Sequence, residues 1–220
     1  WWTRRMRAAM NRFDAVRIDH FIGLHHAYEI PNESRTALTG VWRSAPGRAL
    51  LTAIRRGLGG DLPVVAEDLG ALTPEVTALR DRFGIPGMKL LHDAFGADDH
   101  DSMPHRHARH LVCYLGTHDN PTTVEWWARL DHGSRARAGA YMGWDGIDPA
   151  AALVRLAFSS PANTAIATMQ DLLSLGPEAR MNIPGSSSGN WTWRLQPFGP
   201  ASLRNDVADR IHALAMLTGR

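Results

Sequence analysis

The sequence predicts an α/β protein, and the placement of its polar residues favours part of a (β/α)₈ TIM barrel over an open, doubly wound sheet. Short apolar runs rich in Val, Ile and Leu recur along the 220 residues, and segments with helical patterns lie between them. This alternation is typical of buried parallel strands joined by helices. A polar or acidic group follows each run, as in barrels, whose functional groups come from the ends of several strands. An open dinucleotide-binding sheet usually has a glycine-rich first turn, and no G-x-G-x-x-G is present.

Five apolar runs are expected to form the parallel strands. The first leads into Asp19, the second into Glu67 and Asp68, and the fourth into a turn that contains Asp119. Because the carboxyl ends of barrel strands share one face, these acids are expected to converge there. The five runs are residues 15–18, 63–66, 88–91, 111–115 and 165–169.

Four segments have helical patterns. Apolar and arginine positions alternate at helical spacing over residues 1–10, and residues 49–57 form a second candidate helix. A third begins with Thr73 as its cap and Pro74 at its first position, and it ends at Gly84. The last is amphipathic, with an apolar face made of Leu203, Val207, Ile211 and Leu214.

Length and charge exclude several kinds of organisation and partner. A chain of 220 residues can bury one sizeable core and leaves little room for a second domain. The formal net charge is +2, the charges are interspersed, and Lys89 is the single lysine, so no nucleic-acid-binding face is predicted. No apolar run approaches the roughly 18 residues of a membrane span, so no membrane partner is predicted either.

The cysteine content indicates a reducing compartment. Cys113 is the single cysteine, so no internal disulfide can form, and a cytoplasmic protein is expected. Nothing at the start resembles a signal peptide, and the first residue is Trp1 rather than methionine. We therefore expect the natural protein to have further sequence before Trp1.

Three acids at strand ends are the strongest candidates for catalysis. Arg17 and Asp19 lie two positions apart on one strand and therefore share a face, where the guanidinium would keep the carboxylate ionised. Glu67 follows an apolar run, and apolar surroundings favour a carboxyl that holds and donates a proton. Two carboxyls in different protonation states perform glycoside chemistry, and Asp119 would stabilise positive charge at the reacting carbon.

Other interpretations of the same residues remain open. A single Asp at a strand end is more often a helix cap or a loop hydrogen-bonding group than a catalyst. The eleven histidines, with His118 next to Asp119, suggest a metal-dependent phosphohydrolase as an alternative, although no H-E-x-x-H spacing occurs. No metal and no other cofactor is expected, because acid–base and nucleophilic groups suffice.

Three short blocks resemble the signature blocks of the 4-α-glucanotransferases, the amylomaltase or disproportionating-enzyme family of the α-amylase clan. They are R-I-D-H-F at 17–21, A-E-D-L-G at 66–70 and G-T-H-D-N at 116–120. Supporting stretches extend to A-R-M-N-I-P-G at 179–185 and G-N-W-T-W-R at 189–194, so the ordered set spans essentially the whole chain.

The resemblance implies a retaining transglycosylase that acts on maltooligosaccharides or α-glucans. Asp19 would be the nucleophile, Glu67 the general acid/base and Asp119 the transition-state stabiliser. Retention requires a separation of about 5–5.5 Å between the Asp19 and Glu67 carboxyls. The resemblance further implies that the substrate is contacted by Arg17, His118 and Asn190. Two aromatic residues near the substrate loop are candidates for stacking on a sugar, namely Trp191 and Trp193.

The resemblance also implies that residues 1–220 are the C-terminal part of a catalytic barrel, roughly strands four to eight with their helices. The N-terminal strands and a further subdomain would lie outside this chain. An unclosed barrel exposes two sheet edges, so the chain alone is expected to be inactive or poorly soluble. Two alternatives stay open, an α-1,4-glucan hydrolase of the same clan and a glucan-binding fragment without turnover.

Overall fold

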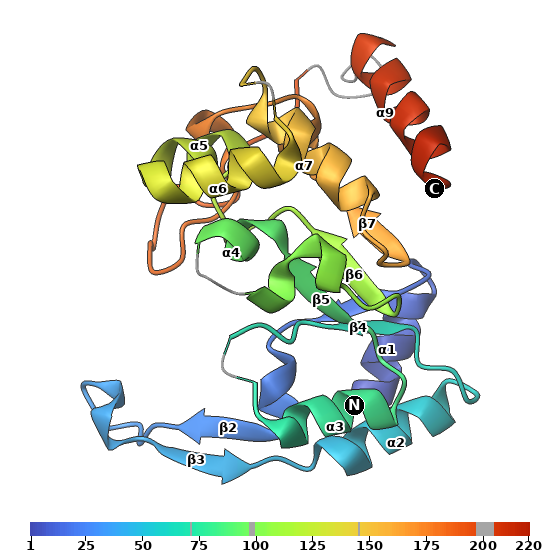
Figure 1. The fold of residues 1–220 in the computed structure, drawn as a ribbon. Coiled ribbons are helices and arrows are strands. Elements are labelled where there is room, and N and C mark those ends of the chain that lie inside the picture. The colour runs from blue at the N-terminus through green and yellow to red at the C-terminus, as the bar shows by residue number, and fades with distance from the viewer. Residues whose placement is uncertain (71, 97–99, 145, 197–204) are drawn as a thin grey trace. The chain divides into compact units, whose positions relative to one another are not determined.

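The computed structural model describes residues 1–70, 72–96, 100–144, 146–196 and 205–220. The chain divides into two compact units, Trp1–Met88 and Lys89–Arg220, each with its own hydrophobic core. In Figure 1 the first unit runs from blue to green and the second from green to red. The two units are described separately below.

The first unit contains a parallel strand pair, a hairpin and three helices. Strands β1 and β4 pair in parallel with Val16 opposite Val64 and Ile18 opposite Ala66. Strands β2 and β3 pair antiparallel. In chain order the elements are α1 (Trp2–Met10), β1 (Val16–Ile18), β2 (His26–Glu29), β3 (Val41–Ser44), α2 (Gly47–Gly57), β4 (Val64–Ala66) and α3 (Pro74–Arg82).

The core of the first unit forms where α2 and α3 turn their apolar stripes inward. Leu51 and Ile54 lie one turn apart on α2, and Val76 and Leu79 lie one turn apart on α3. All four pack in one cluster with Val64 of β4 and are buried. This packing fixes the β1–β4 pair from which the candidate acids follow.

The hairpin was not predicted from the sequence. Every residue of β3 is exposed, and Trp42 keeps 60% of its surface accessible. The hairpin is held by its aromatic rings, since Tyr28 and Trp42 lie 5.1 Å apart between centroids and the Tyr28 ring fills the space where Gly40 would carry a Cβ. In Figure 1 it extends away from α2 and α3.

The second unit is a three-stranded sheet covered by helices. The strand order is β5-β6-β7, and β6 pairs with β7 in parallel, Cys113 opposite Ala165. Strand β5 runs across the boundary between the units. In chain order the elements are β5 (Gly87–Leu90), α4 (Leu91–Gly96), β6 (Leu111–Tyr114), α5 (Thr123–Arg129), α6 (His132–Met142), α7 (Pro149–Phe158), β7 (Thr164–Ile166), α8 (Met169–Leu172) and α9 (Asn205–Thr218).

Side-chain caps begin the helices of the second unit. A side-chain oxygen accepts a hydrogen bond from a main-chain N–H in the first turn of each of three helices: Thr122 caps α5, Asp131 caps α6 and Asp148 caps α7. The helices bury Leu153 and Trp126 against β6, where burial raises the pKa of the Cys113 thiol to about 12. A thiol in that environment stays protonated and unreactive.

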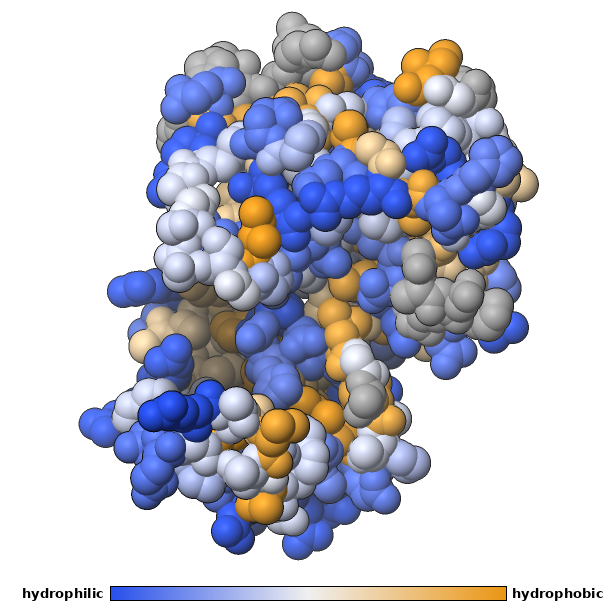
Figure 2. Space-filling view, turned by 90° about the vertical axis from the view of Figure 1, so that its left-hand side faces the viewer, coloured by the Kyte–Doolittle hydropathy of each residue, from blue (hydrophilic) through white to orange (hydrophobic). Residues whose placement is uncertain are grey.

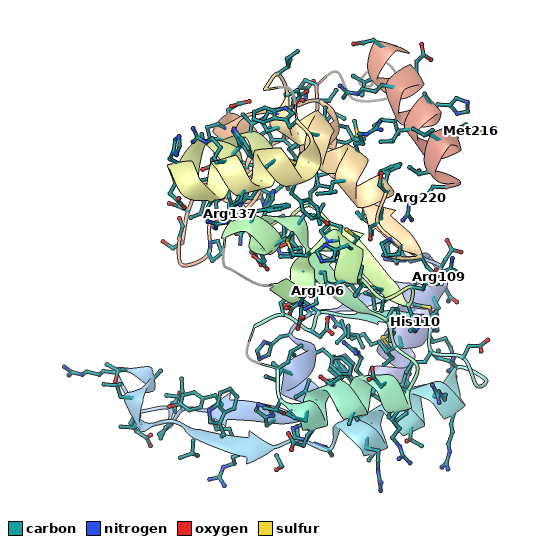
Figure 3. The ribbon with its side chains drawn as sticks, in the orientation of Figure 1. Arg106, Arg109, His110, Arg137, Met216 and Arg220 are labelled. Carbon is teal, nitrogen blue, oxygen red and sulfur yellow. The ribbon has the colours of Figure 1, made fainter. Side chains whose placement is uncertain are left out.

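Helix α9 ends against the last turn of α7. The Arg220 guanidinium donates to the carbonyls of Phe158, Ser160 and Ala162 at 2.6–2.7 Å, which satisfies backbone acceptors that a helix end leaves open. Figure 3 shows Met216 one turn earlier and pointing away from α7, and its side chain is 70% exposed.

The structure confirms the five predicted strands and shows the open arrangement expected of part of a barrel. Each predicted apolar run overlaps a strand, and the predicted helices correspond to α1, α2, α3 and α9, although Leu203 lies outside the described residues. Within the described part of the chain the strand ladders do not close into a ring. The architecture observed is therefore a mixed α/β chain with parallel strand pairs, one antiparallel hairpin and open strand ladders.

The surface agrees with the interspersed charges of the sequence. On the face shown in Figure 2, hydrophilic residues cover most of the surface and hydrophobic residues appear in small groups. None of the helices in the described ranges is long and apolar enough to cross a membrane.

Candidate active site

Arg17 and Asp19 form an ion pair at the end of β1. The two residues share a face of the strand, and Arg17 Nη1 lies 2.7 Å from Asp19 Oδ1. Arg17 is held on its other side, where Nε donates to the Met88 Sδ atom at 3.4 Å. The Asp19 side chain is 72% exposed, so its second oxygen faces solvent while the first is oriented by the guanidinium.

Glu67 occupies the register position opposite Asp19. Backbone hydrogen bonds continue past both strands, because the Glu67 N–H donates to the Ile18 carbonyl at 2.9 Å and the Phe21 N–H donates to the Glu67 carbonyl at 3.0 Å. One step past the Ile18–Ala66 pair, Asp19 and Glu67 are neighbours across strands that lie about 4.8 Å apart. The fold therefore brings these two predicted acids together.

The main chain at His20 orients the Glu67 carboxylate. His20 has a φ of 48°, in the left-handed region, and its N–H donates to Glu67 Oε2 at 2.6 Å. A non-glycine residue in this conformation is strained and persists only where its surroundings hold it. In the sequence His20 appears only as a member of the R-I-D-H-F block and as one of the eleven histidines, and no side-chain signal points to this main-chain role.

Asp68, next to Glu67, has a structural function. Its side chain is 4% exposed, forms an ion pair with Arg80, and accepts a hydrogen bond from the Met88 N–H at 2.8 Å. The carboxylate fills the space beside Gly87, where a Cβ would collide with it. Asp68 thus fixes the chain behind Glu67.

Asp119 lies in a tight turn after β6 in the second unit. Asn120 closes the turn by accepting a hydrogen bond from the Thr117 N–H at 2.8 Å. Asp119 Oδ1 accepts from Asn182 Nδ2 at 2.5 Å, and Oδ2 lies 3.4 Å from His118 Nε2. The Asp119 main-chain carbonyl accepts from Arg180 at 3.2 Å. The carboxylate is 45% exposed and oriented through both oxygens.

Asn190 and Trp191 shape the loop beside His118. The Trp191 ring lies 5.0 Å from the His118 ring between centroids, and the Trp191 N–H donates to the Met181 carbonyl at 2.7 Å. The Asn190 amide accepts from the Ile183 N–H at 2.9 Å and donates to the Ser186 carbonyl at 3.0 Å. Asn190 therefore braces this loop, and its role as a glucan contact remains a prediction.

His92 is buried behind the turn that carries His118 and Asp119. Burial lowers the pKa of His92 to about 3, so the ring is neutral, and its Nε2 lies 3.0 Å from Thr123 Oγ1. The ring stacks on Trp126 at 4.7 Å and leaves no room for a Cβ at Gly116. A pocket of about 120 Å³ between His92, the turn and Arg180 lies next to this ring.

The predicted site residues fall into two groups. Arg17, Asp19 and Glu67 come together in the first unit, and His118 and Asp119 come together in the second, with Asn190 in the adjoining loop. Among the described residues, no three His, Cys, Asp or Glu side chains are grouped to hold a metal ion.

The fold and these side chains define a class, namely α/β proteins that carry paired carboxylates at the carboxyl ends of parallel strands. A family model described as 4-alpha-glucanotransferase matches residues 1–200, and the chain belongs to this family. The match covers both groups of candidate site residues.

Relatives support the same assignment. The chain is 45% identical over 225 residues to a 4-alpha-glucanotransferase of Synechocystis sp., 43% over 229 residues to one of Thermus thermophilus, and 41% over 222 residues to a chloroplastic or amyloplastic one of Arabidopsis thaliana. Each match covers 100% of this chain and 38–45% of the relative. The chain thus spans about two fifths of the length of these relatives.

Solved structures show a similar fold. Amylomaltase from Streptococcus agalactiae, in complex with acarbose, matches with a TM-score of 0.92 and 31% identity, covering 100% of this chain and 44% of that one. Amylomaltase from Corynebacterium glutamicum matches with a TM-score of 0.65 and 19% identity over 86% of this chain and 33% of that one, a likeness of fold alone.

Proposed function

We propose that this chain carries the catalytic acids of a retaining 4-α-glucanotransferase that transfers α-1,4-glucan segments between maltooligosaccharides. The observation that carries the proposal is the register at the ends of β1 and β4, which makes Asp19 and Glu67 neighbours in a chain of this family. Neighbouring strands support the carboxyl separation of about 5–5.5 Å that a double displacement requires.

In the first step, Glu67 donates its proton to the glycosidic oxygen while Asp19 attacks the anomeric carbon. The bond from that carbon to the leaving oxygen breaks, and a glucosyl ester forms on Asp19. In the second step, Glu67 removes the proton from the 4-hydroxyl of an acceptor glucan, whose oxygen displaces Asp19 with net retention. The Arg17 ion pair and the His20 N–H preset the orientation of the two carboxyls.

The proposal also gives a role to each residue of the second group. Asp119 stabilises positive charge at the anomeric carbon, and His118 contacts the sugar at the cleaved bond together with Arg17. Asn190 contacts the glucan from the C-terminal loop, where Trp191 offers an aromatic face 52% exposed. The mechanism requires no cofactor.

The same proposal assigns residues 1–220 to the C-terminal part of a catalytic barrel, with β1, β4, β5, β6 and β7 as strands four to eight. The open strand ladders and the greater length of the relatives support this assignment. The missing barrel strands would come from N-terminal sequence of the same protein. The 220 residues alone are accordingly expected to lack activity.

The test uses the natural-length protein incubated with maltotriose, with the products resolved by chain length. Glucose together with a ladder of longer maltooligosaccharides is expected, and Glu67→Gln should abolish both. Glu33→Gln, which alters an exposed acid between the hairpin strands, is the matched control and should keep the ladder. Glucose and maltose without longer products would show hydrolysis instead and overturn the transferase assignment.

A further inference from the structure

We infer that Asn182 and Arg180 are positioning residues that set the orientation of the Asp119 carboxylate for charge stabilisation. The inference deepens the proposed function, because Asp119 serves there as the stabilising acid. It rests on contacts of the second unit alone. Neither residue was among the sequence-based site candidates.

Asn182 holds one oxygen of the carboxylate directly. Its Nδ2 donates to Asp119 Oδ1 at 2.5 Å, the shortest of the contacts described for this carboxylate, while His118 Nε2 lies 3.4 Å from the other oxygen. The two partners approach different oxygens, so together they fix the plane of the carboxylate. Hydrogen bonds to an ionised group are among the stronger ones in proteins.

Arg180 holds the main chain of the same residue. Its Nη2 donates to the Asp119 carbonyl at 3.2 Å, and its Nε donates to the Asn182 carbonyl at 3.0 Å. One guanidinium therefore links the residue that orients the carboxylate to the backbone that carries it. The Arg180 side chain is only 12% exposed, so these contacts are largely shielded from water.

Glu125 of α5 anchors the guanidinium. Its Oε1 lies 3.4 Å from Arg180 Nη1 and also pairs with Arg129, and the Glu125 side chain is 9% exposed. The Glu125 N–H donates to Thr122 Oγ1, the cap of α5, at 3.3 Å, which fixes the main chain that carries this carboxylate. Helix α5 thus provides a rigid base from which Arg180 reaches Asp119.

This arrangement suits a group that acts by electrostatic stabilisation. A carboxylate that is already oriented in the free protein does not have to reorganise in the transition state. The Glu125–Arg180 ion pair reaches the main-chain carbonyl of Asp119 and so fixes the backbone that carries the carboxylate. The expected defect of a positioning variant is therefore in kcat rather than in folding.

The main test is Asn182→Asp in the natural-length protein, assayed on maltotriose as a function of pH. The substitution keeps the shape of the side chain but replaces the Nδ2 donor with an oxygen 2.5 Å from the Asp119 carboxylate. Two carboxylates so close share a proton, so the acid limb of the pH–activity profile should move up by about one unit or more. His118, Arg180 and Glu125 also face this position and are unchanged in the variant.

The companion variant is Asn182→Ala, which removes the donor without adding charge. We expect kcat to fall by about 10- to 100-fold, as the loss of a hydrogen bond to a charged group implies, with KM within about twofold and thermal unfolding little changed. Asn163→Asp adds the same charge at an exposed position before β7 and should alter neither kcat nor the acid limb.

Carboxyl ¹³C spectra of the same variants provide a readout independent of activity. In Asn182→Asp the new pair should titrate in two separate steps. If Asn182→Asp shows two titration steps but the wild-type protein forms no maltooligosaccharides longer than its substrate, the positioning contact would be supported and the proposed function overturned. An unshifted acid limb, one titration step and an unchanged kcat in Asn182→Ala would overturn the inference.

Discussion

Replacing Asp68 with alanine is expected to destabilise the first unit by about 4 kcal/mol. The substitution leaves the buried Met88 N–H without its carboxylate acceptor, a loss of about 1–3 kcal/mol. It also breaks an ion pair with Arg80, and removing one partner of a buried pair costs about 3–5 kcal/mol. The sum of these two losses should fall at the low end of its range, because the Arg80 side chain is 20% exposed and keeps its ion pair with Asp81 at 2.7 Å.

The assay is urea denaturation of the natural-length protein, combined with hydrogen exchange at the Met88 amide. The unfolding midpoint should fall, and Met88 should lose protection because its acceptor is gone. Asp81→Ala is the matched control, since Asp81 pairs with the same guanidinium but is 58% exposed and should contribute less than about 1 kcal/mol. Equal losses for the two variants, or an unchanged Met88 amide, would refute the reasoning.

Three further predictions concern the second unit. Burial depresses the pKa of His92 to about 3, so burying the neutral ring costs no stability above the unfolded pKa of 6.5. As the pH falls from 6.5 toward 3, the free energy of unfolding should decline by up to about 1.4 kcal/mol per pH unit, because only the unfolded state takes up the proton. In urea titrations at several pH values, His92→Gln should flatten that decline, whereas His212→Gln at an exposed position should not. Gly116→Ala should destabilise by about 1–3 kcal/mol in thermal unfolding, because the new Cβ would lie 2.7 Å from His92 Nδ1, and a stability equal to wild type would contradict this packing. Asp148→Ala should cost about 1–2 kcal/mol by removing the cap of α7, with Asp148→Asn restoring most of it; an uncapped variant of full stability would count against the cap.

The strands could be predicted because burial imposes a pattern on their sequence. Residues of β4 and β6 are apolar on both faces, as in strands covered on both sides, and polar residues follow at once. The hairpin lacks that signal, because β3 is exposed along its whole length and is held by ring contacts between Tyr28 and Trp42. Helix α6 escaped prediction for a related reason, since its buried positions are the small residues Ser134 and Ala138 rather than a stripe of large apolar ones.

The candidate acids and the Arg17 partner of Asp19 could be predicted, but the partner of Asp119 could not. Asp19 and Glu67 follow strands directly and Asp119 lies in the turn after β6, so their position along the chain indicates where they lie. Asn182 is 63 residues from Asp119, and its contact depends on how the segment after α8 folds back onto the turn after β6. The spacing of residues along the sequence does not indicate that these two segments contact each other. The A-R-M-N-I-P-G block at 179–185 identified the segment but not its contact with Asp119.

The neighbouring acids Glu67 and Asp68 show why burial and partners, rather than residue type, separate a candidate catalyst from a structural carboxylate. Successive residues of an extended chain point to opposite faces, so one of two consecutive acids after β4 must turn away from the other. Glu67 is partly exposed and receives one hydrogen bond from a main-chain N–H, which orients the carboxyl without neutralising it. Asp68 is buried against a guanidinium and a backbone donor, so that its charge is already compensated. A carboxyl that must exchange a proton with a substrate needs surroundings like those of Glu67. The buried contacts of Asp68 supply the rigid backbone that keeps Glu67 in place.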